Sequence, residues 1–463
     1  MTALVSTAHV RGLIAHAGYR IAGAGAANSE SFTLDHTLTT TSTRRTNDVK
    51  TPVPDYLDHV LDEVRDIDDG EVAEGLPHID VKDPTELAAA VCTVTGNVYT
   101  AGDADVEFTI QSISKAFVYG LALQELGREK VFETVGTEAS GEPFNELSLG
   151  RETNRPMNPM INAGAIAVNQ LINGEDSSVE DRVEIIRAFL SELAGRELKV
   201  NEDILDSELE DSDRNLAIAH MLASHGVIHD DPRQAVISYQ RQCSIEVTVK
   251  DLAVMSATLA NGGVQPVTGK KVLNPDACRL ALAMMGTAGM YDGSGRWMST
   301  VGIPAKSGVS GGLIGTLPGQ LGLSTLSPRL NPQGNSVRGV KIFEQFSEEM
   351  GLHLMASDPV GAHAVRAIET EGKETTVQLQ GSIHFAAAER ALDRLSDYDF
   401  NCKCLVLDVS RVSGFEKVGR VLVKEGLRRL RDDGFEIAIY DPKEKFGDLE
   451  FSDGTCAEVV GER

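Results

Sequence analysis

The sequence predicts an α+β protein with two domains, of which the larger combines an antiparallel sheet, covering helices and a helical subdomain. A β-hairpin pattern at residues 89–101 and a glycine-rich, β-branched segment at residues 298–328 stand on either side of a helical middle. Strands of the hairpin and strands of the glycine-rich segment can therefore share one sheet. From residue 377 onward the patterns alternate as β-α-β-α-β, which predicts a second, small α/β domain.

The first elements of the large domain follow from apolar spacing and turn residues. Apolar residues recur at helical spacing over residues 56–64, and residues 89–95 and 98–101 have the composition of two short strands. Gly96-Asn97 stands between these strands and is typical of a tight hairpin turn. The segment after the hairpin predicts a buried helix that begins near Ser112, because its apolar residues again recur at helical spacing.

Capping signals place the helices of the middle segment. Ser177–Glu180 match a capping box before an apolar stripe that ends at Gly195. Thr248–Asp251 open another helix, which Gly262-Gly263 close. Residues 338–350 have the apolar spacing of a last helix of this domain.

Composition changes along the chain predict five segments. They are an extension (1–50), a large domain (51–355), a linker (356–374), a small domain (375–445) and a C-terminal tail (446–463). The extension is rich in Ala, Gly, Ser and Thr, and its first acidic residue is Glu30. We interpret it as disordered, with an organelle transit peptide as the alternative.

Composition also excludes several classes of function. The 463 residues carry a formal net charge of −26, which argues against nucleic acid and anionic membranes as partners. No apolar run approaches the ~18 residues that a membrane-spanning helix needs. The six cysteines are scattered, so we expect neither a zinc site nor a disulfide framework. Reduced thiols are typical of the cytoplasm, where we expect the protein.

Ser112 and Lys115 form an S-x-x-K motif at the start of the helix that follows the hairpin. Residues three apart share a helix face, so the Lys115 ammonium can reach the Ser112 hydroxyl. Burial lowers the proton affinity of a lysine, which can then act as a base near neutral pH. The pattern predicts an acyl-transfer nucleophile with a lysine base; the alternative is an ordinary helix start with a surface lysine.

A second motif, Lys306-Ser-Gly308, lies in the glycine-rich segment about 190 residues further on. Serine β-lactamases and penicillin-binding proteins carry a similar K-[ST]-G strand along their pocket. Such a strand can present a backbone N–H as part of an oxyanion hole. The competing interpretation is a plain edge strand. Together the two motifs favour serine acyl transfer.

Motifs spread over residues 54–354 resemble the serine-dependent glutaminase family. They are Gln111-Ser-Ile-Ser-Lys115, Asn158-Pro-Met-Ile-Asn-Ala-Gly-Ala165, Asp213-Arg-Asn215, Tyr239 before Gln242-Cys-Ser-Ile-Glu-Val-Thr248, Leu259-Ala-Asn-Gly-Gly263, Gly289-Met-Tyr-Asp292 and Pro304-Ala-Lys-Ser-Gly-Val309. The resemblance implies a β-lactamase-like fold that hydrolyses L-glutamine to L-glutamate and ammonia. It implies no cofactor and no metal, and relatives are usually homo-oligomers.

The resemblance also implies a role for each matching residue. Ser112 matches the nucleophile and Lys115 its base, and Tyr239 and Tyr291 match pocket tyrosines that assist proton transfer and contact the substrate. Val309 matches the residue whose N–H joins that of Ser112 in the oxyanion hole. The residues that match those holding the amino-acid end of glutamine are Gln111, Asn162, Glu208 and Asn215. An acid for the ammonium and amides for the carboxylate suit a zwitterion.

Two features depart from known patterns. Where the family has a pocket tyrosine, this chain has Gly75, so a substrate-contacting phenol is missing there. Residues 375–445 resemble a STAS domain through Val406–Ser413, but Lys417 stands where signalling members carry a phosphorylated serine. A phosphoserine switch is therefore not expected, whereas docking of a protein or a small molecule remains open.

Two other functions compete with a glutaminase. A penicillin-recognising acyltransferase or β-lactamase would have a signal peptide and an S-D-N-type motif, and the sequence shows neither. A regulatory STAS protein with a retired catalytic domain is disfavoured by the intact set of Ser112, Lys115, Tyr239 and Lys306. Ammonia release from glutamine, compared with asparagine and a chromogenic β-lactam, would separate these functions.

Overall fold

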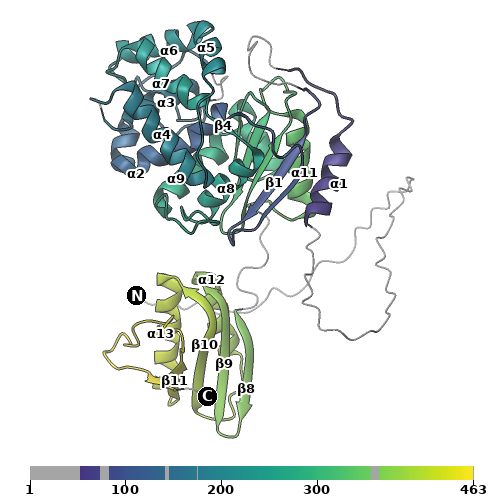
Figure 1. Ribbon diagram of the computed structural model, residues 1–463. Helices are drawn as coiled ribbons and strands as arrows, with labels where there is room; N and C mark the ends of the chain where they lie inside the picture. The colour runs from purple at the N-terminus through teal and green to yellow at the C-terminus, as the bar shows by residue number, and fades with distance from the viewer. Residues whose placement is uncertain (1–52, 73–82, 141–144, 175, 356–363, 462–463) are drawn as a thin grey trace, which may run out of the picture. The chain divides into compact units, whose positions relative to one another are not determined.

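The computed structural model describes residues 53–72, 83–140, 145–174, 176–355 and 364–461 (Figure 1). Residues 1–50 and Gly75, which the sequence singled out, lie outside these ranges. The described residues form a large domain, up to residue 355, and a small domain from residue 364. Each domain is described by itself below.

The large domain contains a five-stranded sheet in the order β2-β1-β7-β6-β5. Every neighbouring pair in it is antiparallel. Its first two strands form the predicted hairpin, and the other three come from the glycine-rich segment. The strands are β1 (Ala88–Thr93), β2 (Val98–Gly102), β5 (Ala305–Ser307), β6 (Gly312–Leu317) and β7 (Leu321–Leu326). The prediction of one antiparallel sheet built from both ends of the domain is confirmed.

Helices cover both faces of this sheet (Figure 1). Successive side chains of a strand point to opposite faces, and in β1 the successive residues Ala90 and Val91 belong to two different apolar cores. The Val91 core contains residues of α1 (Val53–Val64) and α11 (Val337–Glu349). The Ala90 core contains residues of α2 (Ser114–Thr134), α8 (Val249–Ala260) and α9 (Pro275–Ala288). The sheet is therefore buried between two layers of helices.

The helical middle forms the predicted subdomain. Its helices are α3 (Asn162–Leu171), α4 (Val179–Ala194), α5 (Glu202–Glu210), α6 (Asp213–Ser224) and α7 (Pro232–Cys243). Apolar residues of α3, α6 and α7 make a separate core that includes Ile166, Ala219 and Val236. Two short pieces, β3 (Phe108–Thr109) and β4 (Glu246–Val247), pair antiparallel beside the start of α2.

Two helix boundaries differ slightly from the prediction. The cap of α4 is Ser178, which accepts a hydrogen bond from the Asp181 N–H, one residue after the predicted Ser177. Residues 294–300 form α10 (Ser294–Thr300), so strand structure begins at Ala305 and not at residue 298. The Thr248–Asp251 capping box and the left-handed Gly195 at the end of α4 are confirmed.

The small domain has the predicted β-α-β-α-β order. Its sheet has the order β12-β11-β10-β9-β8, in which β9 to β12 are parallel and β8 is antiparallel to β9. Its core is drawn from residues 364–457 alone. The elements are β8 (Val365–Glu371), β9 (Glu374–Ile383), α12 (Phe385–Ser396), β10 (Cys404–Phe415), α13 (Lys417–Asp432), β11 (Glu436–Tyr440) and β12 (Glu458–Val459).

The small domain extends beyond the segment 375–445 in both directions. Residues 365–371, which the sequence placed in the linker, form the edge strand β8. An edge strand keeps polar residues on its exposed side, which gave this segment the composition of a linker. At the other end, Phe446 and Phe451 are buried in the domain core, so the predicted tail is part of the fold.

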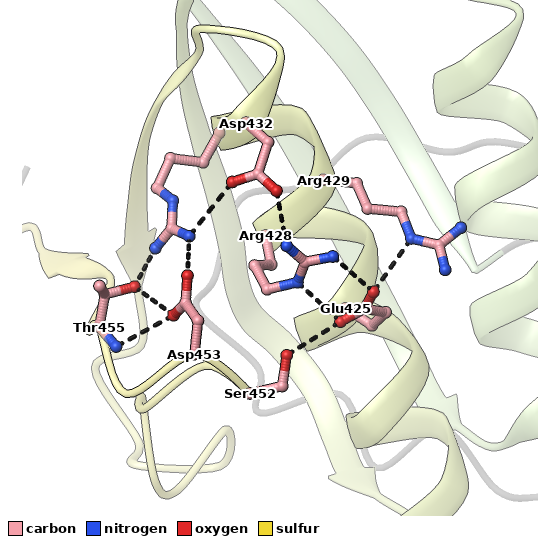
Figure 2. A network of polar contacts seen from close by, with 8 residues as sticks. Glu425, Arg428, Arg429, Asp432, Ser452, Asp453 and Thr455 are labelled. Carbon is pink, nitrogen blue, oxygen red and sulfur yellow. Dashed lines mark hydrogen bonds and ion pairs between the residues drawn. The ribbon is translucent and has the colours of Figure 1, made fainter.

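Charged side chains also join the C-terminal segment to α13 (Figure 2). Glu425 of α13 accepts hydrogen bonds from Arg428 and from Ser452 of the C-terminal segment. Asp453 pairs with Arg431 of α13. Because exposed ion pairs contribute only about 0–1 kcal/mol each, we attribute most of the anchoring to the two buried phenylalanines.

Among the described helices, none is long and apolar enough to cross a bilayer. The described residues also hold no group of three or more His, Cys, Asp or Glu side chains placed to bind a metal ion. No disulfide joins the six cysteines, of which Cys92, Cys243 and Cys278 are buried.

Candidate active site

Ser112 lies in a short 3-10 turn, η1 (Gln111–Ile113), immediately before α2. Its side chain is almost buried. The preceding residue, Gln111, has φ = +50°, a left-handed conformation that costs a non-glycine residue about 1–2 kcal/mol. Two groups fix this turn: the Ile110 N–H donates to the Ile245 carbonyl (2.8 Å), and the Gln111 amide donates to Thr109 Oγ1 (3.1 Å). The nucleophile candidate therefore sits on a constrained backbone.

Lys115 lies one helical turn after Ser112 and is 2% exposed. Its Nζ donates to Asn162 Oδ1 at 2.6 Å. Burial lowers the pKa of Lys115 to about 8, because the charged form loses its hydration. With a pKa of about 8, roughly a tenth of the Lys115 side chains are neutral at pH 7. This lysine can therefore accept a proton near neutral pH.

Two buried tyrosines flank the Ser112–Lys115 pair. The Tyr291 hydroxyl donates to the Ser307 carbonyl at 3.0 Å and is also hydrogen-bonded to Ser112. The Tyr239 hydroxyl lies 3.4 Å from Asn162 Oδ1, and the centre of its ring is 5.9 Å from Lys115 Nζ. Burial raises the pKa of both phenols, so both are neutral hydrogen-bond donors at physiological pH.

Lys306 of β5 is a second fully buried lysine. Its Nζ donates to the Ser307 carbonyl at 2.7 Å and lies 4.1 Å from the centre of the Tyr291 ring. Burial, followed by repulsion from Lys115, holds the pKa of Lys306 well below its usual range. The Ser307 carbonyl thus accepts hydrogen bonds from both Tyr291 and Lys306, which fixes the tyrosine against β5.

Amide and acid side chains from the helical subdomain complete the site. Gln111 Nε2 donates to Glu208 Oε1 of α5 at 2.5 Å, and burial raises the pKa of Glu208 to about 7. Asn162 Nδ2 of α3 donates to Asn215 Oδ1 of α6 at 3.0 Å. Asn162 and Asn215 lie in the same region as Lys115, because Asn162 contacts both Lys115 and Asn215.

Val309 is half-buried in the turn that joins β5 to β6. The neighbouring Gly308 lies against the nucleophile turn, since a Cβ atom there would be only 3.3 Å from the Ile110 carbonyl oxygen. The β5–β6 turn thus packs on η1. Gly75, where the family carries a tyrosine, lies outside the described residues.

The sequence did not assign a role to three residues that contact this site. The Ser114 hydroxyl donates to the Gln111 carbonyl at 2.7 Å, and Gln242 Nε2 donates to Ser114. The Cys243 thiol is hydrogen-bonded to Tyr239 and Ser114, and burial raises its pKa to about 12. Helical spacing could have found two of them, because Gln242 and Cys243 follow Tyr239 by three and four residues on α7.

Comparisons with known proteins agree with one another. A family model described as Glutaminase matches residues 70–355. A protein of Corynebacterium efficiens named Glutaminase is 60% identical over 415 residues, which cover 90% of this chain and 98% of that protein. A crystal structure of Mglu in its L-glutamate binding form is 42% identical with a TM-score of 0.79, and covers 86% of this chain and 100% of that one. A structure titled probable glutaminase ybaS is 37% identical with a TM-score of 0.62, over 65% of this chain and 99% of that one.

Proposed function

This chain belongs to the glutaminase family, and from that premise we propose that it hydrolyses L-glutamine to L-glutamate and ammonia through an acyl-enzyme on Ser112, with Lys115 as the base. The observation that carries the proposal is the buried pair itself. Ser112 sits one turn before a lysine whose pKa is about 8 and is hydrogen-bonded to the buried Tyr291. A nucleophile beside a base is the arrangement that covalent acyl transfer requires.

In the first step Ser112 Oγ attacks the side-chain amide carbon of glutamine, and neutral Lys115 takes the hydroxyl proton. The N–H groups of Ser112 and Val309 stabilise the oxyanion of the tetrahedral intermediate. When the intermediate collapses, the C–N bond breaks and the Lys115 ammonium returns its proton to the leaving nitrogen, which departs as ammonia. A γ-glutamyl ester on Ser112 remains.

In the second step a water molecule attacks this ester while Lys115 accepts one of the water protons. The C–O bond to Ser112 then breaks, Lys115 returns the proton to Ser112 Oγ, and L-glutamate leaves. Tyr291 steadies Ser112 Oγ through their hydrogen bond, and Tyr239 carries a phenol next to Lys115 and Asn162. Each step uses the chain's own groups, so the proposal includes no cofactor.

Recognition of the amino-acid end follows from the acid and amide groups. We assign the substrate ammonium to Glu208, an acid hydrogen-bonded to Gln111, and the substrate carboxylate to Asn162 and Asn215. A charge-assisted hydrogen bond is about twice as strong as a neutral one, so both substrate charges find suitable partners. The L-glutamate that Mglu binds has the same amino-acid end as glutamine, which supports a site for such an end in this chain.

Substrate comparison tests the reaction. Purified protein is expected to release ammonia from L-glutamine far faster than from L-asparagine, because the shorter side chain places the amide away from Ser112. A penicillin-recognising enzyme would instead open a chromogenic β-lactam. Hydrolysis of the β-lactam without ammonia release from glutamine would contradict the proposal.

The pH dependence of kcat/KM is expected to show two ionisations on its acidic side. Lys115, with a pKa of about 8, must be neutral, and Glu208, with a pKa of about 7, must be ionised. As pH falls, kcat/KM should drop about tenfold per unit between pH 8 and 7, and up to about a hundredfold per unit below pH 7.

Glu208→Gln separates these two ionisations. Its side chain is similar in size but does not titrate, so kcat/KM should fall only tenfold per pH unit throughout, and KM for glutamine should rise. A profile with the wild-type slope below pH 7 would show that Glu208 is not the group responsible.

For the small domain we propose a STAS-like fold that regulates the enzyme or its assembly into homo-oligomers in the cytoplasm. The parallel strands β9 to β11 with α12 and α13 support the resemblance of Val406–Ser413 to the STAS signature. Lys417 begins α13 at the position of the phosphorylated serine in signalling members. The proposed regulation therefore acts through docking of a protein or a small molecule, without phosphorylation.

A chain that ends at residue 355 is expected to fold and to keep kcat within about twofold of the full chain. The apolar cores of the two domains share no residue, and independent cores fold independently. The solved ybaS structure, which matches only 65% of this chain, supports the same expectation. The measurements are circular dichroism and ammonia release. A folded but inactive shortened protein would contradict this independence.

A further inference from the structure

We propose that Ser114 and Gln242 are positioning residues that hold the nucleophile turn, and with it Ser112, in the reactive geometry. The inference rests on the proposed role of Ser112 as nucleophile. It concerns a chain of buried hydrogen bonds behind the active site that starts at the backbone of η1 and ends in the helical subdomain.

The chain begins at the strained residue. Gln111 has φ = +50°, and its carbonyl accepts a hydrogen bond from Ser114 Oγ at 2.7 Å. Strained backbone persists only where the surroundings determine it strongly. Ser114 is fully buried, so no water replaces this hydrogen bond if the hydroxyl is removed.

Further hydrogen bonds extend this network to two more helices. Ser114 Oγ accepts from Gln242 Nε2 of α7 at 2.9 Å. Gln242 Oε1 accepts from Asn169 Nδ2 of α3 at 3.0 Å, and Asn169 Oδ1 accepts from Ser238 Oγ at 2.7 Å. All four side chains are 0% exposed. In a buried network each hydrogen bond strengthens its neighbours, and loss of one member leaves a partner unpaired.

The same helices carry residues of the candidate active site. On α3, Asn162 precedes Asn169 by two helical turns, and on α7, Tyr239 precedes Gln242 by one. The network therefore fixes α2, α3 and α7 relative to one another directly behind Ser112, Asn162 and Tyr239. A shift of this network would move Ser112 relative to Asn162 and Tyr239. Since a displacement of about 1 Å can lower a rate about a hundredfold, we expect the effect in kcat.

A matched control exists in the same domain. Ser256 of α8 is also 0% exposed, donates to a backbone carbonyl (Gly315, 2.6 Å) and pairs with a second side chain (Thr316 Oγ1, 2.6 Å). Ser256→Ala thus removes the same kind of hydrogen bond as Ser114→Ala. The difference is that both of its partners lie in β6, and neither of them belongs to the nucleophile turn.

The experiment compares steady-state kinetics and thermal midpoints of the full-length variants. Ser114→Ala and Ser256→Ala are both expected to lower the thermal midpoint. Ser114→Ala should lower kcat about ten- to a hundredfold with KM within about threefold, whereas Ser256→Ala should keep kcat within about twofold. The kinetics are measured well below the thermal midpoints of both variants, where both are folded, so a lower kcat at unchanged KM does not come from lost stability.

Gln242→Met tests the hydrogen-bond network from the side of α7 and remains informative if Ser114→Ala does not fold. It should also lower kcat at unchanged KM, and its effect should not add to that of Ser114→Ala, because residues in one network couple. The effects of Gln242→Met and Ser256→Ala should add.

Equal kcat values for Ser114→Ala, Gln242→Met and Ser256→Ala would overturn the positioning role. Ser112→Ala distinguishes this outcome from failure of the proposed function. If Ser112→Ala is inactive while the Ser114 and Gln242 variants are fully active, only the positioning role fails. If Ser112→Ala is active, the acyl-enzyme mechanism fails as well, and the positioning role fails with it.

Discussion

Replacement of Ser112 by alanine is expected to lower kcat for glutamine by three or more orders of magnitude while the thermal midpoint stays nearly unchanged. The proposed mechanism has no other group that can form the γ-glutamyl ester, and loss of a nucleophile in a catalytic unit removes most of the rate. Alanine fits the space of serine and suits the start of a helix. The hydrogen bond between Ser112 and Tyr291 is lost, but Tyr291 keeps its bond to the Ser307 carbonyl.

Ammonia release by the purified variant, measured beside Ser256→Ala, decides this prediction. Both variants lose one buried serine hydroxyl, but only Ser112→Ala loses it at the candidate active site. A Ser112→Ala protein that keeps more than about a tenth of the wild-type kcat would mean that the serine does not attack the substrate.

Replacement of Lys115 by methionine is expected to abolish activity to a similar extent and yet to stabilise the fold. The pKa of Lys115 falls from 10.5 to about 8 on burial, and at ~1.4 kcal/mol per pKa unit the buried ammonium costs about 3 kcal/mol of folding free energy at neutral pH. Methionine removes this charge and has a similar length. Loss of the hydrogen bond to Asn162 offsets part of the gain, so we expect a rise in thermal midpoint of a few degrees.

The stabilisation should depend on pH in a defined direction. The folded-state pKa of Lys115 is depressed, so the unfolded chain binds more protons between about pH 8 and 10.5, and wild-type stability rises with pH in that window. The advantage of Lys115→Met is therefore full below pH 8 and disappears toward pH 10.5. An advantage that is the same at every pH would contradict the buried-charge explanation.

The large-scale fold was predictable because its signals are local. The hairpin turn at Gly96-Asn97 and the capping box at Thr248–Asp251 each lie within a few residues. The cap of α4 was misplaced by one residue because two neighbouring serines are each followed three residues later by an acid. The edge strand β8 was missed because its pattern is polar, as expected for a strand with one neighbour.

The candidate site was predictable to the extent that its residues stand in recognisable motifs. Ser112, Lys115, Asn162 and Tyr239 were named from such motifs. The structure places Lys115 and Tyr239 beside Asn162, and it pairs Ser112 with Tyr291, which was also named. The left-handed conformation of Gln111 has no sequence signal, because glutamine does not favour it. The bond between Ser114 and Gln242 joins residues 128 positions apart, and no local pattern reports such a contact.

The two buried lysines have a consequence for anyone who would engineer this protein. Burial disfavours the charged form of both Lys115 and Lys306, so an apolar side chain at either position removes an amine that is costly to bury. A library screened for heat resistance alone would therefore enrich variants that have lost these lysines. Variants that have lost Lys115 would also have lost the catalytic base. The selected variants would be more resistant to heat and inactive. Selection for a robust variant must measure ammonia release in the same round as heat resistance.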